Sequence, residues 1–247
     1  MTPAGGYGAG ALLRDLRTRF RRGWNAIDSA DRKRWLRLIA GGIAGMIVLM
    51  LALVGVGKAL VASGALAWEV DFLRGLETDG PFSYSTAVWF QTFGTDITLW
   101  ILVALTAGIA LWMGRPLTAL SIILAYAVVD AVVRLGWLTW DRARPTVLYE
   151  GVTAPSFHAF PSGHTGKTIA VYGLLVWLWI RSAPGWLEKS LALLLLTTIT
   201  FVVPFGRMTM GVHWPSDVIA GWLLGASWCV VLILGLRYER TIFREGR

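Results

Sequence analysis

The chain has 247 residues, of which 55% are hydrophobic and 15% are charged, and its formal net charge at pH 7 is +8. A soluble domain carries about 25% charged residues, so this composition excludes an ordinary soluble protein and indicates several membrane spans. The single cysteine, Cys229, excludes a disulfide framework within one chain, and we expect it to be a core or lipid-facing residue.

The N-terminal arm, residues 1–37, is the most basic part of the chain. It carries nine arginines and lysines, and a tail at 237–247 carries four more arginines, whereas residues 63–96 contain only Arg74 against five acids. This asymmetry follows the positive-inside rule and places both termini in the cytoplasm. Binding of the arm to anionic lipid headgroups is a second interpretation of the same charges.

Six apolar runs follow the arm and predict an all-α, polytopic membrane protein with a six-helix bundle. Each run approaches the ~20 residues that cross a bilayer, and the predicted spans are 38–62, 97–113, 117–138, 167–181, 190–206 and 217–236. The first external loop, 63–96, is rich in aromatics and glycine and suits short interfacial helices. We therefore expect a basic cytoplasmic arm (1–37), one membrane domain (38–236) and a basic cytoplasmic tail (237–247).

Three polar clusters stand at the mouths of predicted spans, in segments that this topology places on the non-cytoplasmic side. The third cluster, in chain order, combines Arg207, His213 and Asp217. Asp217 is four residues after His213, so its carboxylate can accept from one imidazole nitrogen and leave the other free to attack phosphorus. A histidine that merely caps a helix at the interface is the alternative interpretation of this cluster.

The second cluster is Pro161-Ser162-Gly163-His164, at the start of the fourth span. Ser162 takes the place of an N-cap, and Gly163 lets backbone amides approach an anion at the positive end of the helix. His164 can then protonate a leaving oxygen. A plain helix start is the alternative interpretation of this cluster. Lys167, one turn later, either reaches the same phosphate or extends its ammonium to the membrane surface.

The first cluster supplies arginines. Arg144 precedes Pro145, which helps to fix the backbone, and is a candidate for a two-point contact with phosphate. Arg142 either contributes to the same site or only pairs with the neighbouring Asp141.

Together the clusters resemble the membrane branch of the type 2 phosphatidic acid phosphatase family. The family pattern is K-x-x-x-x-x-x-R-P, then P-S-G-H, then S-R-x-x-x-x-x-H-x-x-x-D. The matching positions, in order, are Arg144-Pro145, Pro161 to His164, and Arg207 with His213 and Asp217. The motifs are a small part of the chain, but the six-helix layout extends the likeness from about residue 38 to 236.

The resemblance implies a lipid phosphatase whose site opens at the outer leaflet of a bacterial plasma membrane. It implies that His213 forms a phosphohistidine, that Asp217 orients it and that His164 protonates the leaving group. Substrate phosphate is then bound by Arg144, Arg207, Ser162 and Gly163. No metal and no other cofactor is implied, and the partners are the lipid phosphate and membrane lipids.

Two positions depart from the family pattern. Trp137 stands where the family has lysine, and Gly206 stands where it has serine. Arg134, one turn before Trp137, is our candidate for the missing cation, with Lys167 as an alternative. Asp130 lies four residues before Arg134, so an ion pair between them is the competing interpretation. Trp137 either lines the pocket or anchors its helix at the interface.

We therefore expect an integral membrane enzyme that hydrolyses an isoprenyl diphosphate or a phospholipid phosphate. The alternatives are a phosphotransferase that uses the same intermediate and a lipid-phosphate binder or transporter without hydrolysis. A nucleic-acid module is the least favoured function, because the basic residues lie on the opposite side from the site and carry no reading motif. The sequence leaves the oligomeric state open.

Overall fold

All regular secondary structure in the described part of the chain is helical. The computed structural model describes residues 9–80, 82–145 and 158–243, so part of the predicted arm (1–8) and tail (244–247) lies outside it. The elements are α1 (Ala9–Ala26), α2 (Ser29–Ala62), α3 (Trp68–Asp79), α4 (Tyr84–Gln91), the 3₁₀ helix η1 (Thr92–Gly94), α5 (Asp96–Trp112), α6 (Pro116–Thr139), α7 (Gly163–Ser182), α8 (Trp186–Thr209), α9 (Pro215–Gly235) and the 3₁₀ helix η2 (Leu236–Phe243). The all-α prediction is confirmed.

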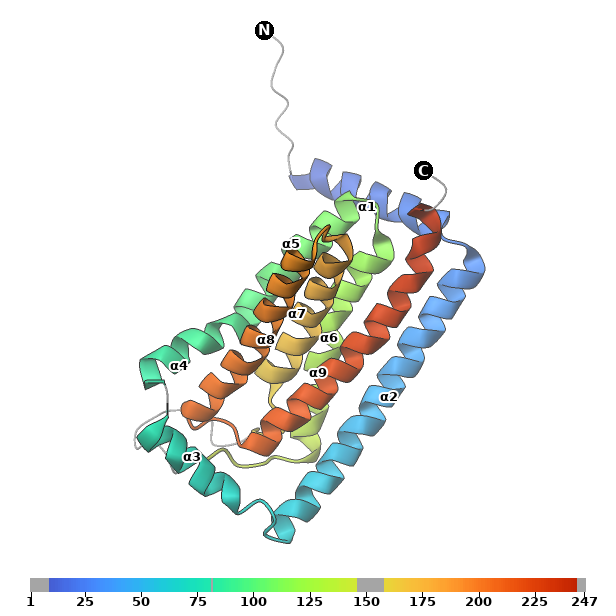
Figure 1. Ribbon diagram of the computed structural model, residues 1–247. Helices are drawn as coiled ribbons and strands as arrows, with labels where there is room; N and C mark the ends of the chain where they lie inside the picture. The colour runs from blue at the N-terminus through green and yellow to red at the C-terminus, as the bar shows by residue number, and fades with distance from the viewer. Residues whose placement is uncertain (1–8, 81, 146–157, 244–247) are drawn as a thin grey trace.

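The long helices form one bundle. Figure 1 shows α2, α5, α6, α7, α8 and α9 side by side, with α1 across one end and α3 and α4 at the other. Helix α7 is central, because it packs against α5, α6, α8 and α9. The short helices predicted in 63–96 are confirmed as α3 and α4.

Five helical stretches in the described residues are long and apolar enough to cross a membrane. They are Ser29–Ala62, Tyr84–Trp112, Pro116–Thr139, Trp186–Thr209 and Pro215–Glu239. The remaining predicted span corresponds to α7, which is 20 residues long but opens with the polar turn Gly163 to Thr168 and is not among the five. The helices also begin earlier than predicted, and α2 starts at Ser29 because the Asp28 side chain accepts from Ala30 N at 2.8 Å and caps it.

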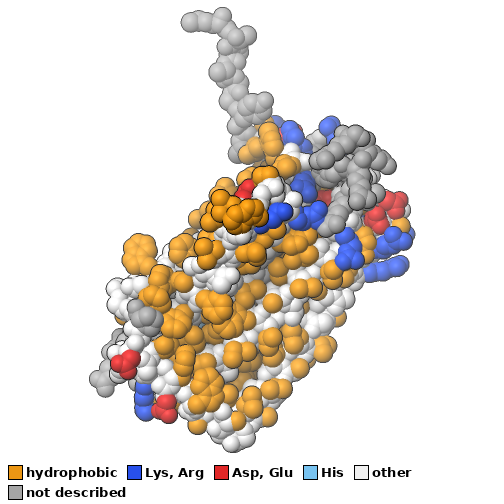
Figure 2. All heavy atoms as spheres, viewed as in Figure 1, with side chains coloured by type: hydrophobic (Ala, Val, Ile, Leu, Met, Phe, Trp, Pro, Cys, Tyr) orange, Lys and Arg blue, Asp and Glu red, His pale blue; other side chains and the backbone are white. Residues whose placement is uncertain are grey.

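The surface has the character of a membrane protein. Figure 2 shows hydrophobic side chains over the length of the bundle and lysines and arginines gathered at the end near α1. Large apolar side chains face outward along the bundle, for example Val48 at 67% exposed and Ile97 at 70%. Burial of these side chains in lipid removes a cost that an aqueous surface would impose.

The C-terminal η2 helix is fastened to the bundle through Glu239. Its carboxylate accepts from Leu117 N at 2.7 Å and from Thr118 N at 3.1 Å, and Thr118 Oγ1 also donates to it. These amides are at the N-terminus of α6, where a carboxylate is favoured by the unpaired N–H groups and the helix dipole. The first residues of the predicted tail are therefore part of the folded domain.

Glycines allow α7 and α9 to pack with their backbones in close contact near the cluster end. A Cβ on Gly221 would lie 2.7 Å from Ser162 O, and a Cβ on Gly225 would overlap Gly166 O. Both partner atoms belong to the backbone, so they cannot move aside without shifting a helix. This contact fixes the start of α7 against the start of α9.

Replacing Gly225 by alanine is expected to lower the free energy of unfolding by ~1–3 kcal/mol, because the new methyl group forces α9 away from α7. Gly108→Ala on α5 is the matched control, since nothing lies within 4 Å of its Cβ position. There the higher helix propensity of alanine should leave stability unchanged or slightly raised. Thermal unfolding of both variants in detergent measures the difference, and equal midpoints would contradict the close packing.

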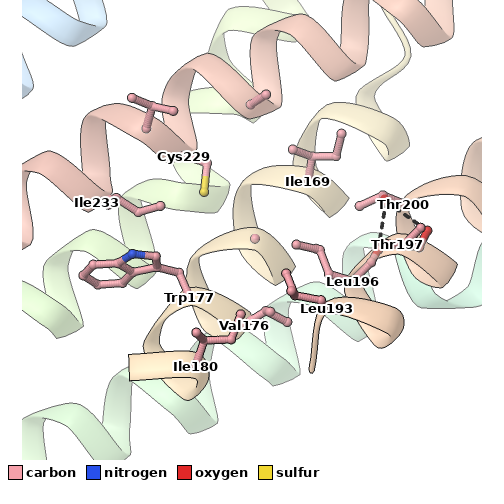
Figure 3. Close-up of a pocket in the computed structure, with 13 residues that line it drawn as sticks. Ile169, Val176, Trp177, Ile180, Leu193, Leu196, Thr197, Thr200, Cys229 and Ile233 are labelled. Carbon is pink, nitrogen blue, oxygen red and sulfur yellow. Dashed lines mark hydrogen bonds between the residues drawn. The ribbon is translucent and has the colours of Figure 1, made fainter. Parts of the chain in front are cut away.

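An apolar groove lies between α8 and α9, with α7 as its floor. Figure 3 shows the side chains around this cavity of about 450 Å³, among them Trp177, Leu196 and Ile233. Trp222 stands on α9 between the groove and Asp217, and its Nε1 donates to Thr200 O of α8 at 3.0 Å. The groove therefore lies along the middle of the helices, at the level that we expect to face the lipid chains, and not at the end where the polar clusters meet.

Candidate active site

The three polar clusters meet at one end of the bundle, opposite α1. The P-S-G-H turn begins α7, Arg207 ends α8, and His213 lies in the connection from α8 to α9, where Asp217 occupies the first turn. The connection after α6 brings Arg142 and Arg144 to the same end. Segments separated by more than 70 residues in sequence thus contribute to one site, as the topology predicted.

His213 is buried, with 2% of its surface exposed. Its Nδ1 lies 2.9 Å from the carbonyl oxygen of Ala159 and 3.6 Å from Asp217 Oδ2. Since a carbonyl only accepts, Nδ1 is the protonated nitrogen and Nε2 keeps its lone pair. The predicted hydrogen bond between Asp217 and His213 is therefore replaced by one to Ala159, and Asp217 acts across a longer distance.

Burial lowers the pKa of His213 well below its ordinary value of 6.5, and the positive charges of Arg207 and Arg144 lower it further. The imidazole is consequently neutral at pH 7. A neutral ring with a fixed Nδ1–H is the form in which Nε2 can attack an electrophile.

Two arginines, Arg144 and Arg207, lie close enough to His213 for their charges to act on it. Arg144 donates from NH1 to Val212 O at 3.3 Å and from NH2 to His158 O at 3.5 Å, and burial lowers its pKa. Arg207 donates from NH1 to Gln91 Oε1, while its buried Nε has no hydrogen-bond partner within the described ranges. The unpaired Nε of Arg207 points to a donor that an anion could use, and the planar guanidinium donors of both arginines match the geometry of phosphoryl oxygens.

The N-terminus of α7 adds backbone donors. The first helical hydrogen bond runs from Gly166 N to Ser162 O at 3.1 Å, so Gly163, His164 and Thr165 have no helical acceptor for their amides. Ser162 occupies the predicted N-cap position, but its Oγ accepts from Thr165 Oγ1 at 2.9 Å and not from a backbone amide. This helix end can therefore bind an anion, as the sequence predicted.

His164 is partly exposed and lies beside Gly94, where its Cβ is 3.6 Å from the position that a glycine Cβ would occupy. It interacts electrostatically with Arg207 and with His213. The two histidines are therefore close enough to each other and to the arginines for their charges to interact. This arrangement suits one attacking and one proton-donating imidazole.

Arg142 does not pair with Asp141, which was one of its two predicted roles. Its guanidinium contacts Asp217 Oδ1 at 2.6 Å and Glu69 Oε2 at 2.7 Å, and Asp141 lies 2.6 Å from His158 Nδ1 instead. Both terminal nitrogens of Arg142 are thus occupied by carboxylates, so the structure favours an ion-paired role for Arg142 over the predicted phosphate contact. The sequence analysis missed Glu69, which is far from the motifs in the chain, and His158, which stands three residues before Pro161 but outside the family pattern.

Lys167 and Arg134, the two candidates for the missing cation, share Asp130. Lys167 contacts Asp130 Oδ1 at 3.1 Å and also Asp96, and Arg134 Nε lies 2.7 Å from Asp130 Oδ2. The expected ion pair between Asp130 and Arg134 is confirmed. Because carboxylates already neutralise both cations, the structure favours a role in joining α5, α6 and α7 over a role in binding phosphate.

Trp137 lies beside the α7 N-terminus and not only at the bundle surface. Its ring stacks on His158 at 5.6 Å between centroids, and its Cζ2 is 3.8 Å from the Cβ position of Gly163. The buried Nε1 has no hydrogen-bond partner in the part of the chain that the structure describes. Of its two predicted roles, lining the pocket is the one that this position supports.

Comparison with known proteins gives relatives and a fold. The chain is 36% identical over 107 residues to an undecaprenyl-diphosphatase of Sulfolobus acidocaldarius, over 41% of this chain and 43% of that protein. It is 28% identical over 152 residues to decaprenylphosphoryl-5-phosphoribose phosphatase of Mycobacterium tuberculosis, over 60% of this chain and 78% of that one. The crystal structure of a transmembrane PAP2-type phosphatidylglycerolphosphate phosphatase from Bacillus subtilis superimposes with a TM-score of 0.62 at 19% identity, over 82% of this chain and 98% of that one.

The chain spans less than half the length of the archaeal relative, and the structural likeness speaks for the fold alone. The sequence profile of the PAP2 superfamily, however, matches residues 118–241, which is half of the chain and includes all three clusters. The protein therefore belongs to the PAP2 superfamily and has the fold of its membrane-spanning members.

Proposed function

We propose that the protein is an integral membrane lipid phosphatase that hydrolyses a lipid phosphate monoester or diphosphate through a phosphohistidine at His213. The observation that carries the proposal is the state of His213. It is buried and neutral, its Nδ1–H is fixed by Ala159 O, and Arg144 and Arg207 lie around it. Family membership and the site geometry support the same reaction.

The reaction has two steps. In the first, the Nε2 lone pair of His213 attacks phosphorus, the bond from phosphorus to the leaving oxygen breaks, and His164 donates a proton to that oxygen. In the second, His164 takes a proton from water, the water oxygen bonds to phosphorus, and the bond between Nε2 and phosphorus breaks to release phosphate. Arg144, Arg207 and the α7 amides hold the phosphoryl oxygens in both steps.

The substrate class rests on the relatives. Two of them are named for undecaprenyl diphosphate and for a decaprenylphosphoryl sugar phosphate, and a third, from Bacillus subtilis, is named phosphatidylglycerophosphatase B. Isoprenyl diphosphates and phospholipid phosphates are therefore the classes to test first.

We also propose that α7 is the sixth span and that the site faces the outer leaflet. Helix α7 is as long as a span and is surrounded by other helices, so its polar first turn is shielded from lipid. The basic α1 and the site lie at opposite ends of the bundle, and the positive-inside rule assigns α1 to the cytoplasm. Hydrolysis of an impermeant lipid phosphate added to intact cells tests this orientation, and hydrolysis only after permeabilisation would contradict it.

Phosphate release by the purified protein in detergent tests the function directly. The assay compares lipid phosphates of both classes without added metal and with a chelator present, and the His213→Ala variant is the control. Release by the wild type alone supports the proposal. Transfer of phosphate to an acceptor lipid without free phosphate would replace it with a phosphotransferase, and tight binding without turnover would replace it with a binding protein.

The pH dependence follows from the lowered pKa of His213. Because attack requires the neutral ring, activity is lost as the pH falls through this lowered pKa, and we expect the acid limb of kcat/KM to lie below pH 6.5. A profile from pH 4 to 8, corrected for the ionisation of the substrate phosphate near pH 6, measures it. If the acid limb lies above pH 6.5 after this correction, a group of the enzyme other than His213 controls the loss of activity.

A further inference from the structure

A chain of buried charges connects the external helix α3 to the catalytic aspartate. Glu69, in the first turn of α3, lies 2.7 Å from one terminal nitrogen of Arg142, and the other terminal nitrogen lies 2.6 Å from Asp217 Oδ1. The exposed fractions of the three side chains are 1%, 9% and 0%. Charges that are this deeply buried are rare unless they are paired and needed for a function.

The geometry leaves Asp217 no freedom to turn. Arg142 holds Oδ1, and the backbone amide of Trp214 donates to Oδ2 at 2.8 Å. Arg142 is itself fixed, because it also donates to Ser216 Oγ at 2.7 Å and its guanidinium lies 5.3 Å and 5.4 Å from the ring centres of Trp140 and Trp214. The carboxylate thus faces His213 Nδ1 at a set distance of 3.6 Å.

Glu69 completes the arrangement from the far side. Its second oxygen accepts from Ser216 N, in the first turn of α9, at 2.7 Å. One carboxylate of α3 therefore binds both Arg142 and the helix that carries Asp217. A shift of α3 would move these two elements together.

The net charge of this cluster also offsets the positive charge that His213 gains during the reaction. Glu69, Arg142 and Asp217 together carry a net charge of −1 when all are ionised, and His213 gains a positive charge when Nε2 bonds to phosphorus. Without Arg142, two buried carboxylates would face each other and one of them would take up a proton. Protonation of Asp217 removes the negative charge that the cationic ring requires.

We propose that Arg142 and Glu69 are positioning residues for Asp217: Arg142 keeps the carboxylate ionised and aimed at His213, and Glu69 fixes Arg142 through the external helix α3. This inference rests on the proposed function, since it assigns roles within the same reaction. It separates Arg142 from Arg144, although only one residue lies between them in the sequence. Arg144 binds substrate, and Arg142 acts through Asp217.

The test measures kcat, KM and the pH profile of Arg142→Gln, Arg142→Lys, Glu69→Gln and the double variant Glu69→Gln/Arg142→Gln, each on the substrate that the wild type hydrolyses. We expect Arg142→Gln to lower kcat by ~100-fold, with KM changed by less than a factor of about three, because misplaced catalytic groups slow the chemical step and not binding. The acid limb of the kcat/KM profile of Arg142→Gln should move to higher pH, because Asp217 takes up a proton more readily without Arg142. Arg142→Lys, which keeps the charge, should return the acid limb toward the wild-type position.

The double variant separates positioning from general structural damage. In Arg142→Gln the Glu69 carboxylate has lost its counter-charge and competes with Asp217, so removing that carboxylate as well should raise kcat above that of Arg142→Gln alone. Purely structural damage would instead make the double variant worse. The matched control is Arg74→Gln on α3, whose exposed pair with Asp71 at 3.8 Å should contribute nothing to kcat.

Each outcome decides the inference. Normal kcat and an unmoved pH profile in Arg142→Gln and Glu69→Gln, with an active wild type, would overturn the positioning roles and leave the proposed function intact. A rise in KM alone would instead assign Arg142 to the substrate phosphate. If Arg142→Gln does not fold, Glu69→Gln and Arg142→Lys still decide, because the first keeps two of the three charges and the second keeps all three. An inactive wild type would contradict the proposed function itself.

Discussion

Replacement of His213 by asparagine is expected to lower kcat by about 10⁴-fold or more, because the variant lacks the nitrogen that we propose to form the bond to phosphorus. Asparagine is the sharpest choice for this position. Its amide nitrogen can take the place of Nδ1 and donate to Ala159 O, as the histidine does at 2.9 Å. The variant then lacks only the nucleophile and keeps the local hydrogen bond that holds the connection between α8 and α9.

The chain offers a matched control for this variant, since it has three histidines. His158 is half exposed and pairs with Asp141, and within the described residues it contacts the site through its backbone carbonyl and its ring stacked on Trp137. We expect His158→Asn to keep at least a third of wild-type kcat. Measurable turnover by a folded His213→Asn protein at more than about 1% of the wild-type rate would show that the nucleophile is another group.

Replacement of His164 by asparagine is expected to have the second largest effect, and its size should depend on the leaving group. A general acid contributes ~10²–10⁴-fold when the leaving oxygen needs a proton. For a lipid phosphate, whose alkoxide leaves poorly, the first step should slow by this factor. For p-nitrophenyl phosphate, whose phenolate leaves without a proton, the first step should slow by less than ~10-fold.

Single-turnover measurements separate the two steps of this prediction. In His164→Asn, water activation is also lost, so p-nitrophenol should appear in a burst that is followed by slow turnover, with phosphate held on the enzyme. Equal losses for both substrates in the first step would contradict the role of His164 as the acid. They would instead indicate that His164 binds the phosphoryl oxygens.

The layout of the helices and the meeting of the clusters could be predicted from the sequence. Apolar runs near the length of a span define membrane helices, because every backbone polar group in lipid must be paired within the segment. The charge asymmetry then sets which connections share a side, and this was enough to place Arg144, His164 and Arg207 at one end. The predicted span in α7 is the one that is not among the five candidate spans, since its first turn, Gly163 to Thr168, is polar and lowers its hydropathy.

The contacts between side chains could not be predicted, because they depend on how distant segments pack. The spacing of His213 and Asp217 predicts a hydrogen bond within one helix start, but Ala159, 54 residues earlier, supplies the acceptor. Likewise, Arg142 stands next to Asp141, yet it pairs with Glu69 at a separation of 73 residues. A signal that could have pointed to Glu69 is its position four residues before Leu73 and seven before Leu76, which puts its carboxylate on the apolar face of α3.

The most direct test of the central claim is to find the phosphoryl group on the enzyme. The wild type and His164→Asn are mixed with a phosphate-labelled substrate, quenched within one turnover under alkaline conditions and digested for mapping. We predict an acid-labile label on the peptide that contains His213, at a higher level in His164→Asn and absent from His213→Asn. The covalent mechanism, and with it the role assigned to His213, would be contradicted if the wild type released phosphate but neither the wild type nor His164→Asn carried label on His213.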